Sequence, residues 1–265
     1  MALQTAPPPT APPPSVFDLK LNRLRFADIP RWLARGVADF RRAPTPGLFY
    51  GSCFVLMGWA LLKVFEHAPA YVLALAAGFL LMGPFVCMGL YRISQRLERG
   101  EAPGLADSLT AWLVRPATLA IFGFALLVIE MLWGRVALVI FAVSFDGMPD
   151  FRGSLLKLLD PENIGFIVAY VGAGAIFAGL IYAISVVSIP MILDRPVDAI
   201  SAALTSLRLV LTQTPVLLAW GATITLLVVL AMLPGFLGLI VVGPVLGHAS
   251  WHAYRAAVAA PQAGA

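Results

Sequence analysis

The chain has 265 residues, of which 60% are hydrophobic and only 12% are charged. A soluble domain carries about 25% charged residues, so this composition excludes an ordinary soluble protein and indicates a polytopic membrane protein in contact with the lipid bilayer. The formal net charge is +4, but the basic residues follow the loops between apolar segments, which excludes a nucleic-acid-binding face. Cys53 and Cys87 lie inside apolar runs, so no disulfide framework is expected.

The first 27 residues, which contain the stretch PPPTAPPP, lack the basic start and apolar centre of a signal peptide. Proline-rich sequence of this kind does not pack as helix or sheet. We therefore expect a disordered tail and short lead-in over 1–27, a membrane domain over 28–258 and a flexible tail over 259–265.

Six segments are long and apolar enough to span a membrane as helices, which requires about 20 residues each. The third continues as RVALVIFAVSF, and we interpret it as one long helix that emerges from the bilayer; a separate interfacial piece is the alternative. The last two are separated only by Pro234-Gly235 and should form a tight hairpin. The fold class expected is therefore all-α, with six transmembrane helices arranged as three hairpins. The segments are 47–64, 69–91, 116–134, 164–193, 215–233 and 235–254.

The distribution of basic residues predicts the orientation. With these spans, 14 of the 18 lysines and arginines fall on one side of the membrane. Short cytoplasmic loops are enriched in Lys and Arg, so both termini should lie in the cytoplasm of a bacterial cell, with the protein in the inner membrane. The loop 146–163 should lie on the far side.

A weak threefold repeat accompanies the spans. Pro30, Pro103 and Pro196 each open a mixed polar and apolar stretch that should form an amphipathic helix in the inner interface. In the first stretch, Ile29, Leu33, Val37 and Phe40 fall near one face. The partner spans contain Pro84, Pro190 and Pro244, and each proline should kink its helix because it frees a carbonyl four residues earlier. For Pro190 that carbonyl belongs to Val186.

Glu130 is the ionisable side chain best placed inside a span, and such residues are costly there and therefore functional candidates. It lies about 21 Å along the helix from Pro116. Arg135 points elsewhere around that helix, so Glu130 needs another polar partner or must be protonated. A coupled transporter usually has several such groups near the midplane, and this single, off-centre acid weakens that interpretation.

The end of the sixth span, LGHASWHAYR, contains His248 and His252. Their spacing of four places both rings on one helical face, as a two-ligand metal or haem site requires. By helical rise, Cys53 and Cys87 lie at a similar depth. Three interpretations remain open: a structural or electrostatic pair bonded to Asp194, Asp198 or lipid headgroups, a metal or haem site, and a pH sensor. The neighbouring Tyr254, Arg255 and Arg195 complete the candidate polar cluster.

Several motifs resemble a bacterial family of integral membrane proteins catalogued only as a domain of unknown function. The first is RWLARGVADFRRAP, which precedes the first span, and the second is Gly83-Pro84, which GLYR follows shortly after. The others are ISVVSIPMILDRPVDA and, at the end, LGLIVVGPVLGHASWHAYR. The resemblance implies a six-helix inner-membrane fold without an established activity. It also draws attention to the end of the fourth span and to the residues around the histidine pair, which are His248, Trp251, His252, Tyr254, Arg255, Asp194, Arg195 and Asp198.

The sequence contains no recognisable catalytic set, so an enzyme is not expected and no cofactor is assigned. Our leading hypothesis is a scaffold or accessory protein that contacts other membrane proteins, or further copies of itself, through its helices. A transporter or channel for a small or lipid-like substrate is the first alternative. A haem- or metal-binding accessory of a respiratory complex, with ligands among His248, His252, Cys53 and Cys87, is the second.

Overall fold

A computed structural model describes residues 19–67, 72–144 and 163–259. Over these ranges the chain is helical, and the one extended pairing described is an isolated antiparallel bridge between Leu21 and Val258. The expectations for the N-terminal tail to residue 18, the far loop and the last six residues concern parts of the chain outside these ranges. The helices are α1 (Asp28–Arg42), α2 (Pro44–His67), α3 (Val72–Glu98), α4 (Leu105–Leu109), the 3₁₀ turn η2 (Ala111–Val114), α5 (Pro116–Ser144), α6 (Ile164–Ser185), α7 (Ser188–Asp194), α8 (Ala199–Thr212), α9 (Thr214–Met232) and α10 (Leu239–Ala257).

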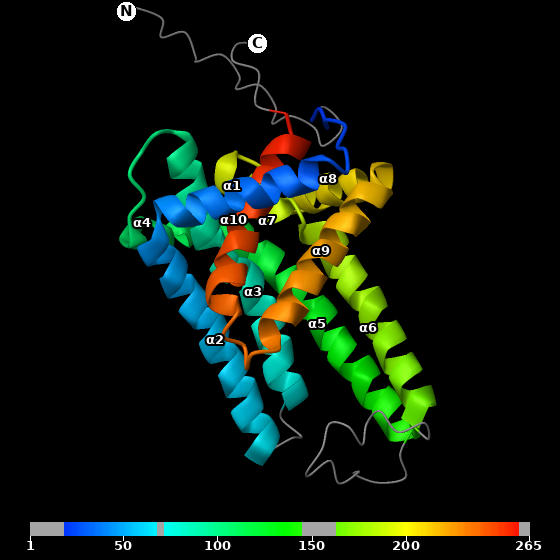
Figure 1. Ribbon diagram of the computed structural model, residues 1–265. Helices are drawn as coiled ribbons and strands as arrows, with labels where there is room; N and C mark the ends of the chain where they lie inside the picture. The colour runs from blue at the N-terminus through cyan, green and yellow to red at the C-terminus, as the bar shows by residue number, and fades with distance from the viewer. Residues whose placement is uncertain (1–18, 68–71, 145–162, 260–265) are drawn as a thin grey trace, which may run out of the picture.

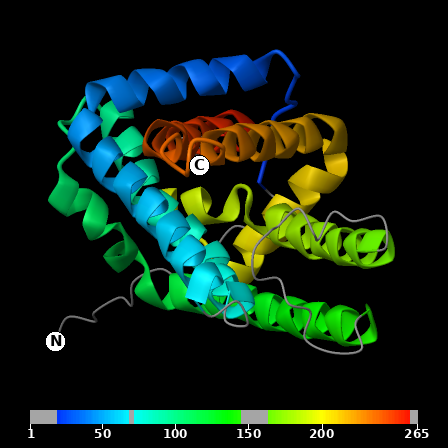
Figure 2. The ribbon, with the colours of Figure 1, turned by 60° about the horizontal axis from the view of Figure 1, so that its bottom comes forward.

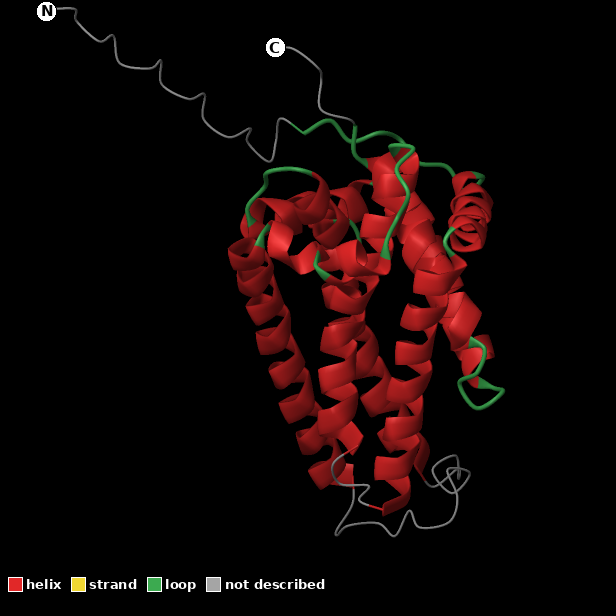
Figure 3. Ribbon diagram, turned by 90° about the vertical axis from the view of Figure 1, so that its left-hand side faces the viewer, coloured by secondary structure: helices red, strands yellow, loops and turns green. Residues whose placement is uncertain are grey.

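The helices form two levels. The short helices α1, α4, α7 and α8 lie together at one end of the molecule, which we call the cap (Figure 1). The long helices α2, α3, α5 and α6 extend from the cap in one direction, and Figure 3 shows the same division from the side. A helical structure suits a lipid environment, because a helix satisfies its own backbone hydrogen bonds.

Four helical segments within the described ranges are long and apolar enough to cross a membrane: Pro44–Val64, Pro116–Ser144, Ile164–Asp194 and Thr214–Met232. The second of these is one continuous helix of 29 residues, so the expectation that the third span runs on past residue 134 is confirmed. Proline supports the starts of these helices: α2 and α5 begin at Pro44 and Pro116, and Pro215 occupies the first turn of α9. Proline fits there because its missing N–H has no helical partner in the first turn.

The expected kink before Pro190 is a complete break. α6 ends at Ser185 and α7 begins at Ser188, so the apolar segment crosses from the long helices into the cap. The carbonyl of Val187 accepts from the backbone N–H of Met191 and begins the new helix. Every residue of α7 from Ser188 to Leu193 is buried, which makes α7 a central element of the cap.

The turn before α10 is longer than the sequence indicated. It occupies six residues, 233–238, so α10 begins at Leu239 rather than at residue 235, and it ends at Ala257. Gly235 and Phe236 have φ angles of 63° and 68°. Two successive left-handed residues close a turn that the Pro234-Gly235 pair alone does not provide.

The amphipathic helices of the cap differ from the expectation in two places. α1 buries Ile29, Trp32, Gly36 and Asp39. Of the face expected to be buried, Leu33, Val37 and Phe40 are therefore turned away from the core and are partly exposed. The reason is that α1 packs against α10 (Figure 2), and only a glycine admits that approach. The stretch after Pro103 forms α4 and η2, with a break at Thr110, in place of one helix.

α10 is the central helix of the packing and contacts α1, α2, α3, α7 and α9. A Cβ added to Gly36 of α1 would lie 2.5 Å from the carbonyl oxygen of Val245. A Cβ on Gly51 of α2 would overlap the carbonyl of Ile240 in the same way. Small residues therefore set the distance between α10 and the first two helices.

The largest fully buried side chains, Trp220, Trp251 and Tyr254, lie in one apolar cluster with Trp32, whose ring meets Trp220 edge-on at 5.5 Å. The segment before α1 also belongs to this core. Leu24 is 6% exposed, so the packed domain begins earlier than residue 28.

Candidate functional site

Both histidines of α10 point into the protein. His248 is fully buried and His252 is 5% exposed. The i,i+4 spacing places the two rings on one face of α10, as the sequence predicted, and that face is turned toward α1 and α3. The interpretation in which they bond to Asp194, Asp198 or headgroups is wrong in its partners, which are Asp39 and Ser94.

Asp39 of α1 joins the two histidines. Its Oδ2 accepts from Nε2 of His252 at 2.8 Å and from the hydroxyl of Ser94 at 2.8 Å. The Ser94 Oγ also lies 2.8 Å from Nδ1 of His248. Because a hydroxyl has one proton, and Ser94 donates it to Asp39, Nδ1 of His248 is the donor to Ser94. Three helices far apart in the chain are thus joined by three hydrogen bonds.

The charge of Asp39 is stabilised by this arrangement. Burial raises the pKa of its carboxyl, but the hydrogen bonds from His252 and Ser94 and the field of the histidines outweigh burial, and the pKa is lowered from its ordinary value. An isolated buried carboxylate would be costly. Asp39 therefore depends on α3 and α10 to remain ionised inside the cap.

A second group of polar residues continues from His252 toward the rim. Nδ1 of His252 is 3.8 Å from Glu98, and Glu98 pairs with Arg255 at 3.1 Å. Arg255 also lies 3.4 Å from Oδ2 of Asp194 at the end of α7. Glu98 and Arg255 are about one third exposed, so solvent screens this part and each pair contributes little by itself.

Asp194 is the centre of this second group. Its carboxylate accepts from the hydroxyl of Tyr254 at 2.8 Å and from the amide of Gln95 at 3.0 Å. Tyr254 in turn accepts from Nε of the buried Arg195 at 3.0 Å, and Arg195 donates to the carbonyl of Ala259. We call the whole set the cap network: Asp39, Ser94, Gln95, Glu98, Asp194, Arg195, His248, His252, Tyr254 and Arg255.

Asp198 has a different role from the one expected. Its side chain accepts from the backbone N–H of Ser201 at 2.9 Å and caps the N-terminus of α8. Hydrogen bonds from Ser201 hold its pKa below the ordinary value. This is the usual function of an aspartate at an N-cap, and it places Asp198 outside the cap network.

Glu130 lies inside the bundle on α5 and is 4% exposed, whereas Arg135 is exposed. Its Oε1 has no hydrogen-bond partner among the described residues. The residue is therefore isolated from the cap network, and an unpaired charge at this position would be costly.

The two cysteines do not extend the histidine pair into a metal site. Cys53 lies on α2 and Cys87 on α3, both as free thiols. Across the described ranges, no group of three or more His, Cys, Asp or Glu side chains is placed to hold a metal ion. Nε2 of His252 is bonded to Asp39 and Nδ1 of His248 to Ser94, whereas Nδ1 of His252 and Nε2 of His248 have no hydrogen-bond partner among the described residues.

Sequence reasoning missed four members of the cap network, Asp39, Ser94, Gln95 and Glu98. A signal for Asp39 was present, since it is the one acid between Pro30 and Pro44 in a stretch with four arginines. Ser94 and Glu98 have the same spacing of four as the histidines, and this places them on one face of α3. The helix–helix contacts that bring these faces together could not be read from periodicity.

The combination of Ser, His and Asp does not have the order of a nucleophilic triad. Ser94 is fully buried, and its proton goes to the carboxylate and not to an imidazole. An activated serine requires the reverse, with the imidazole accepting from the hydroxyl. The geometry instead joins α1, α3, α7 and α10 in fixed positions.

The structure is that of an integral membrane protein. It has four apolar helices of spanning length, an apolar exposed surface on them and a polar network at one end. Residues 72–194, which include α3 to α7, match the family model described as "Predicted integral membrane protein (DUF2189)". The resemblance noted in the sequence is thereby confirmed over that stretch, while the GHASWHAYR motif lies outside it. Comparisons with curated proteins and with solved structures gave no match.

Proposed function

We propose that this chain is a six-span scaffold protein of the bacterial inner membrane that binds a second membrane helix through the outer face of α6. α2, α5 and α9 run away from the cap and α3, α6 and α10 return toward it (Figure 1), which supports three hairpins. The cap contains most of the arginines of the described ranges. A cytoplasmic cap, with both termini on that side, follows from the enrichment of basic residues on the inner side.

The observation that supports a scaffold best is the surface of α6. None of its residues is buried, although Gly174 meets Trp133 of α5 on its inner face. Gly165, Gly172 and Gly179 recur every seven residues, and a Cβ added to any of them would meet nothing within 4 Å. They lie on one outer face with Val168 and Ile176, which are 66% and 73% exposed.

This outer face has the composition that membrane helices use for close approach. In lipid the hydrophobic effect does not drive helices together, so their association depends on van der Waals packing. Glycines favour this packing because they allow two helix backbones to approach closely. Inside the protein, α10 occupies the space beside the glycines at comparable helix crossings, as at Gly36 and Gly51. On the outer face of α6 the same kind of surface has no occupant within the described ranges.

The alternatives have less support. Two pockets of the described ranges lie at the cap, and neither is lined by Glu130, Pro190 or Pro244. A transport path would need water to reach those groups. A haem or metal function would use Nε2 of His248 and Nδ1 of His252, which have no hydrogen-bond partner among the described residues, but no third His, Cys, Asp or Glu of these ranges is placed with them as a metal ligand.

Photo-crosslinking tests the scaffold proposal. A photoreactive amino acid at Ile176 should give one discrete adduct in native membranes, with a second copy or another membrane protein. The same probe at Val143 of α5, which is 83% exposed, is the matched control and should give only lipid adducts. Gly172→Leu should abolish the adduct at 176 because the larger side chain holds the partner helix away.

Gly134→Leu, at another glycine with open space around it, should leave the adduct unchanged. The proposal is wrong if Ile176 and Val143 give the same adducts, or if Gly172→Leu leaves the adduct at Ile176 intact.

A further inference from the structure

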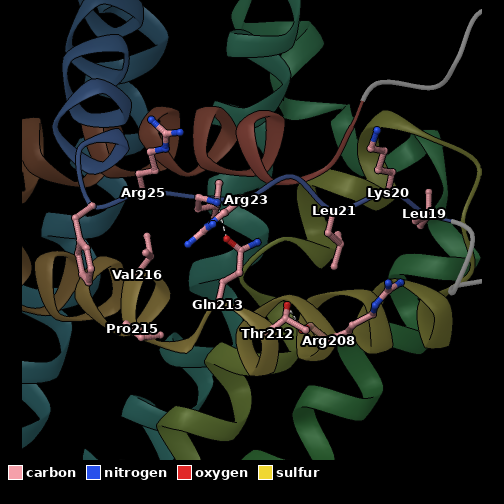
Figure 4. Close-up of a pocket in the computed structure, with 12 residues that line it drawn as sticks. Leu19, Lys20, Leu21, Arg23, Arg25, Arg208, Thr212, Gln213, Pro215 and Val216 are labelled. Carbon is pink, nitrogen blue, oxygen red and sulfur yellow. Dashed lines mark hydrogen bonds between the residues drawn. The ribbon is translucent and has the colours of Figure 1, made fainter.

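One pocket lies at the cap, between the segment that precedes α1 and the junction of α8 and α9. It has a volume of about 1160 Å³ and is lined by twelve residues (Figure 4). Four of them are cationic, Lys20, Arg23, Arg25 and Arg208, and none is acidic. We call this pocket the basic groove. It shares no residue with the cap network or with the outer face of α6.

The groove has a fixed wall. The side chain of Gln213, at the junction of α8 and α9, accepts from the N–H of Leu24 at 2.5 Å and donates to the carbonyl of Asn22 at 2.7 Å. Asn22 also donates from its side chain to the carbonyl of Ala256 at 3.0 Å. These bonds hold the extended segment against both α8 and α10, so its arginines project from a defined position (Figure 4).

The interior of the groove is apolar below its charged rim. Leu21 projects toward α8 (Figure 4), Leu24 is 6% exposed and Val216 is 8% exposed. Asp28, three residues after Arg25, accepts from the backbone N–H of Arg25 and pairs with Arg31. A ligand for this groove therefore carries negative charge and also an apolar part.

The position of the groove indicates the source of such a ligand. It opens where α9, a candidate membrane span, begins at Thr214. The neighbouring α8 exposes Ile200, Leu204 and Leu211 by 69%, 46% and 70%, and the spacing of four and seven places them on one face. A short helix with one exposed apolar face lies at the membrane surface, so the groove is at headgroup depth.

We propose that the basic groove binds the phosphate headgroup of an anionic phospholipid, with its acyl chains alongside α8 and α9. Arginine suits this task because its planar guanidinium donates in pairs to phosphate oxygens. Basic pockets between membrane helices at the cytoplasmic surface recognise anionic headgroups by the same chemistry. This site is independent of the scaffold proposal.

Lipid retention tests the proposal on the full-length protein. The chain is reconstituted into nanodiscs of phosphatidylcholine with a minor fraction of phosphatidylglycerol, released, and examined by native mass spectrometry for bound lipid. The wild type should retain phosphatidylglycerol in preference to phosphatidylcholine. Arg23→Gln with Arg208→Gln should weaken phosphatidylglycerol binding roughly thirty-fold, since each basic residue near anionic lipid contributes about fivefold.

The matched control is Arg41→Gln with Arg42→Gln, which removes the same charge from exposed positions at the end of α1. It should retain phosphatidylglycerol as the wild type does. Equal losses in both double variants would mean that the general positive field is responsible, and would overturn the proposal. Equal retention by the groove variant and the wild type would overturn it as well.

A competition experiment separates the lipid from free phosphate. Inorganic phosphate at millimolar concentration should leave bound phosphatidylglycerol in place, because it lacks the apolar part. If phosphate alone displaces the lipid, the groove is a soluble-anion site and the proposal is wrong. Should the groove variant fail to fold, Lys20→Gln, at an exposed side chain, should still weaken retention about fivefold, and unchanged retention would overturn the proposal.

Discussion

Replacing Asp39 by alanine tests whether the cap network stabilises the fold. The change removes the acceptor shared by His252 and Ser94, which both lie in the buried interior. Each buried donor left without a partner costs about 1–3 kcal/mol, so Asp39→Ala should lower the free energy of unfolding by about 2–6 kcal/mol. That is a large part of the stability of a typical protein, which is about 5–15 kcal/mol.

The measurement is unfolding of the detergent-solubilised protein followed by tryptophan fluorescence. Trp32, Trp220 and Trp251 are all buried in the cap, so their emission reports on this region. Asp107→Ala is the control, because Asp107 is another aspartate of the cap that forms an ion pair, with Arg96, but its side chain is 49% exposed. An exposed pair contributes about 0–1 kcal/mol.

A double-mutant cycle makes the test specific. Asp39→Ala and His252→Ala should each be strongly destabilising, and the double variant should lose much less than their sum, because the partners are in direct contact. Additive losses, or an Asp39→Ala effect no larger than that of Asp107→Ala, would refute the role assigned to the cap network.

Two further predictions follow from the packing and charge of the cap. The lowered pKa of Asp39 contributes stability that is present above the ordinary aspartate value of about 3.9 and is lost as the pH falls toward the folded value. Acid should therefore destabilise the wild type more than Asp39→Asn, and parallel pH profiles of unfolding for the two proteins would contradict this. Gly51→Ala should destabilise by about 1–3 kcal/mol, because its Cβ overlaps the carbonyl of Ile240. Gly172→Ala, with open space around it, should leave the unfolding midpoint within error of the wild type, and an equal loss in both variants would show that the close approach does not limit the packing.

The long helices could be predicted because their signal is local. Apolar length and the prolines before them located α2, α5 and α9 to within a few residues, since a spanning helix needs little more than about 20 apolar residues. The continuation of α5 past Arg135 follows from the same apolar run. The cap helices were harder, because the buried face of α1 is set by contact with α10 and not by hydrophobicity alone.

The candidate site could be predicted only in part from the sequence. The i,i+4 geometry of His248 and His252 follows from helical periodicity, and their position at the end of α10 follows from the spans. Their partner Asp39 is 213 residues away from His252 in the chain, and no local pattern encodes such a pairing. The turn at residues 233–238 was missed for a different reason, since the left-handed conformation of Phe236 is unusual for a bulky residue.

The distance in sequence between Asp39 and its partners has a consequence for the synthesis of the protein. α1 is made before α10, yet α10 supplies both histidines of the cap network and packs against the glycine surfaces of α1 and α2. Domains of this kind close only after the distant segment becomes available. Until the ribosome has released α10, the carboxylate of Asp39 has no imidazole to accept from, and the earlier helices form an incomplete bundle. A chain truncated before residue 239 should accordingly be a substrate for membrane proteases, whereas α10 closes the bundle in a chain that contains it.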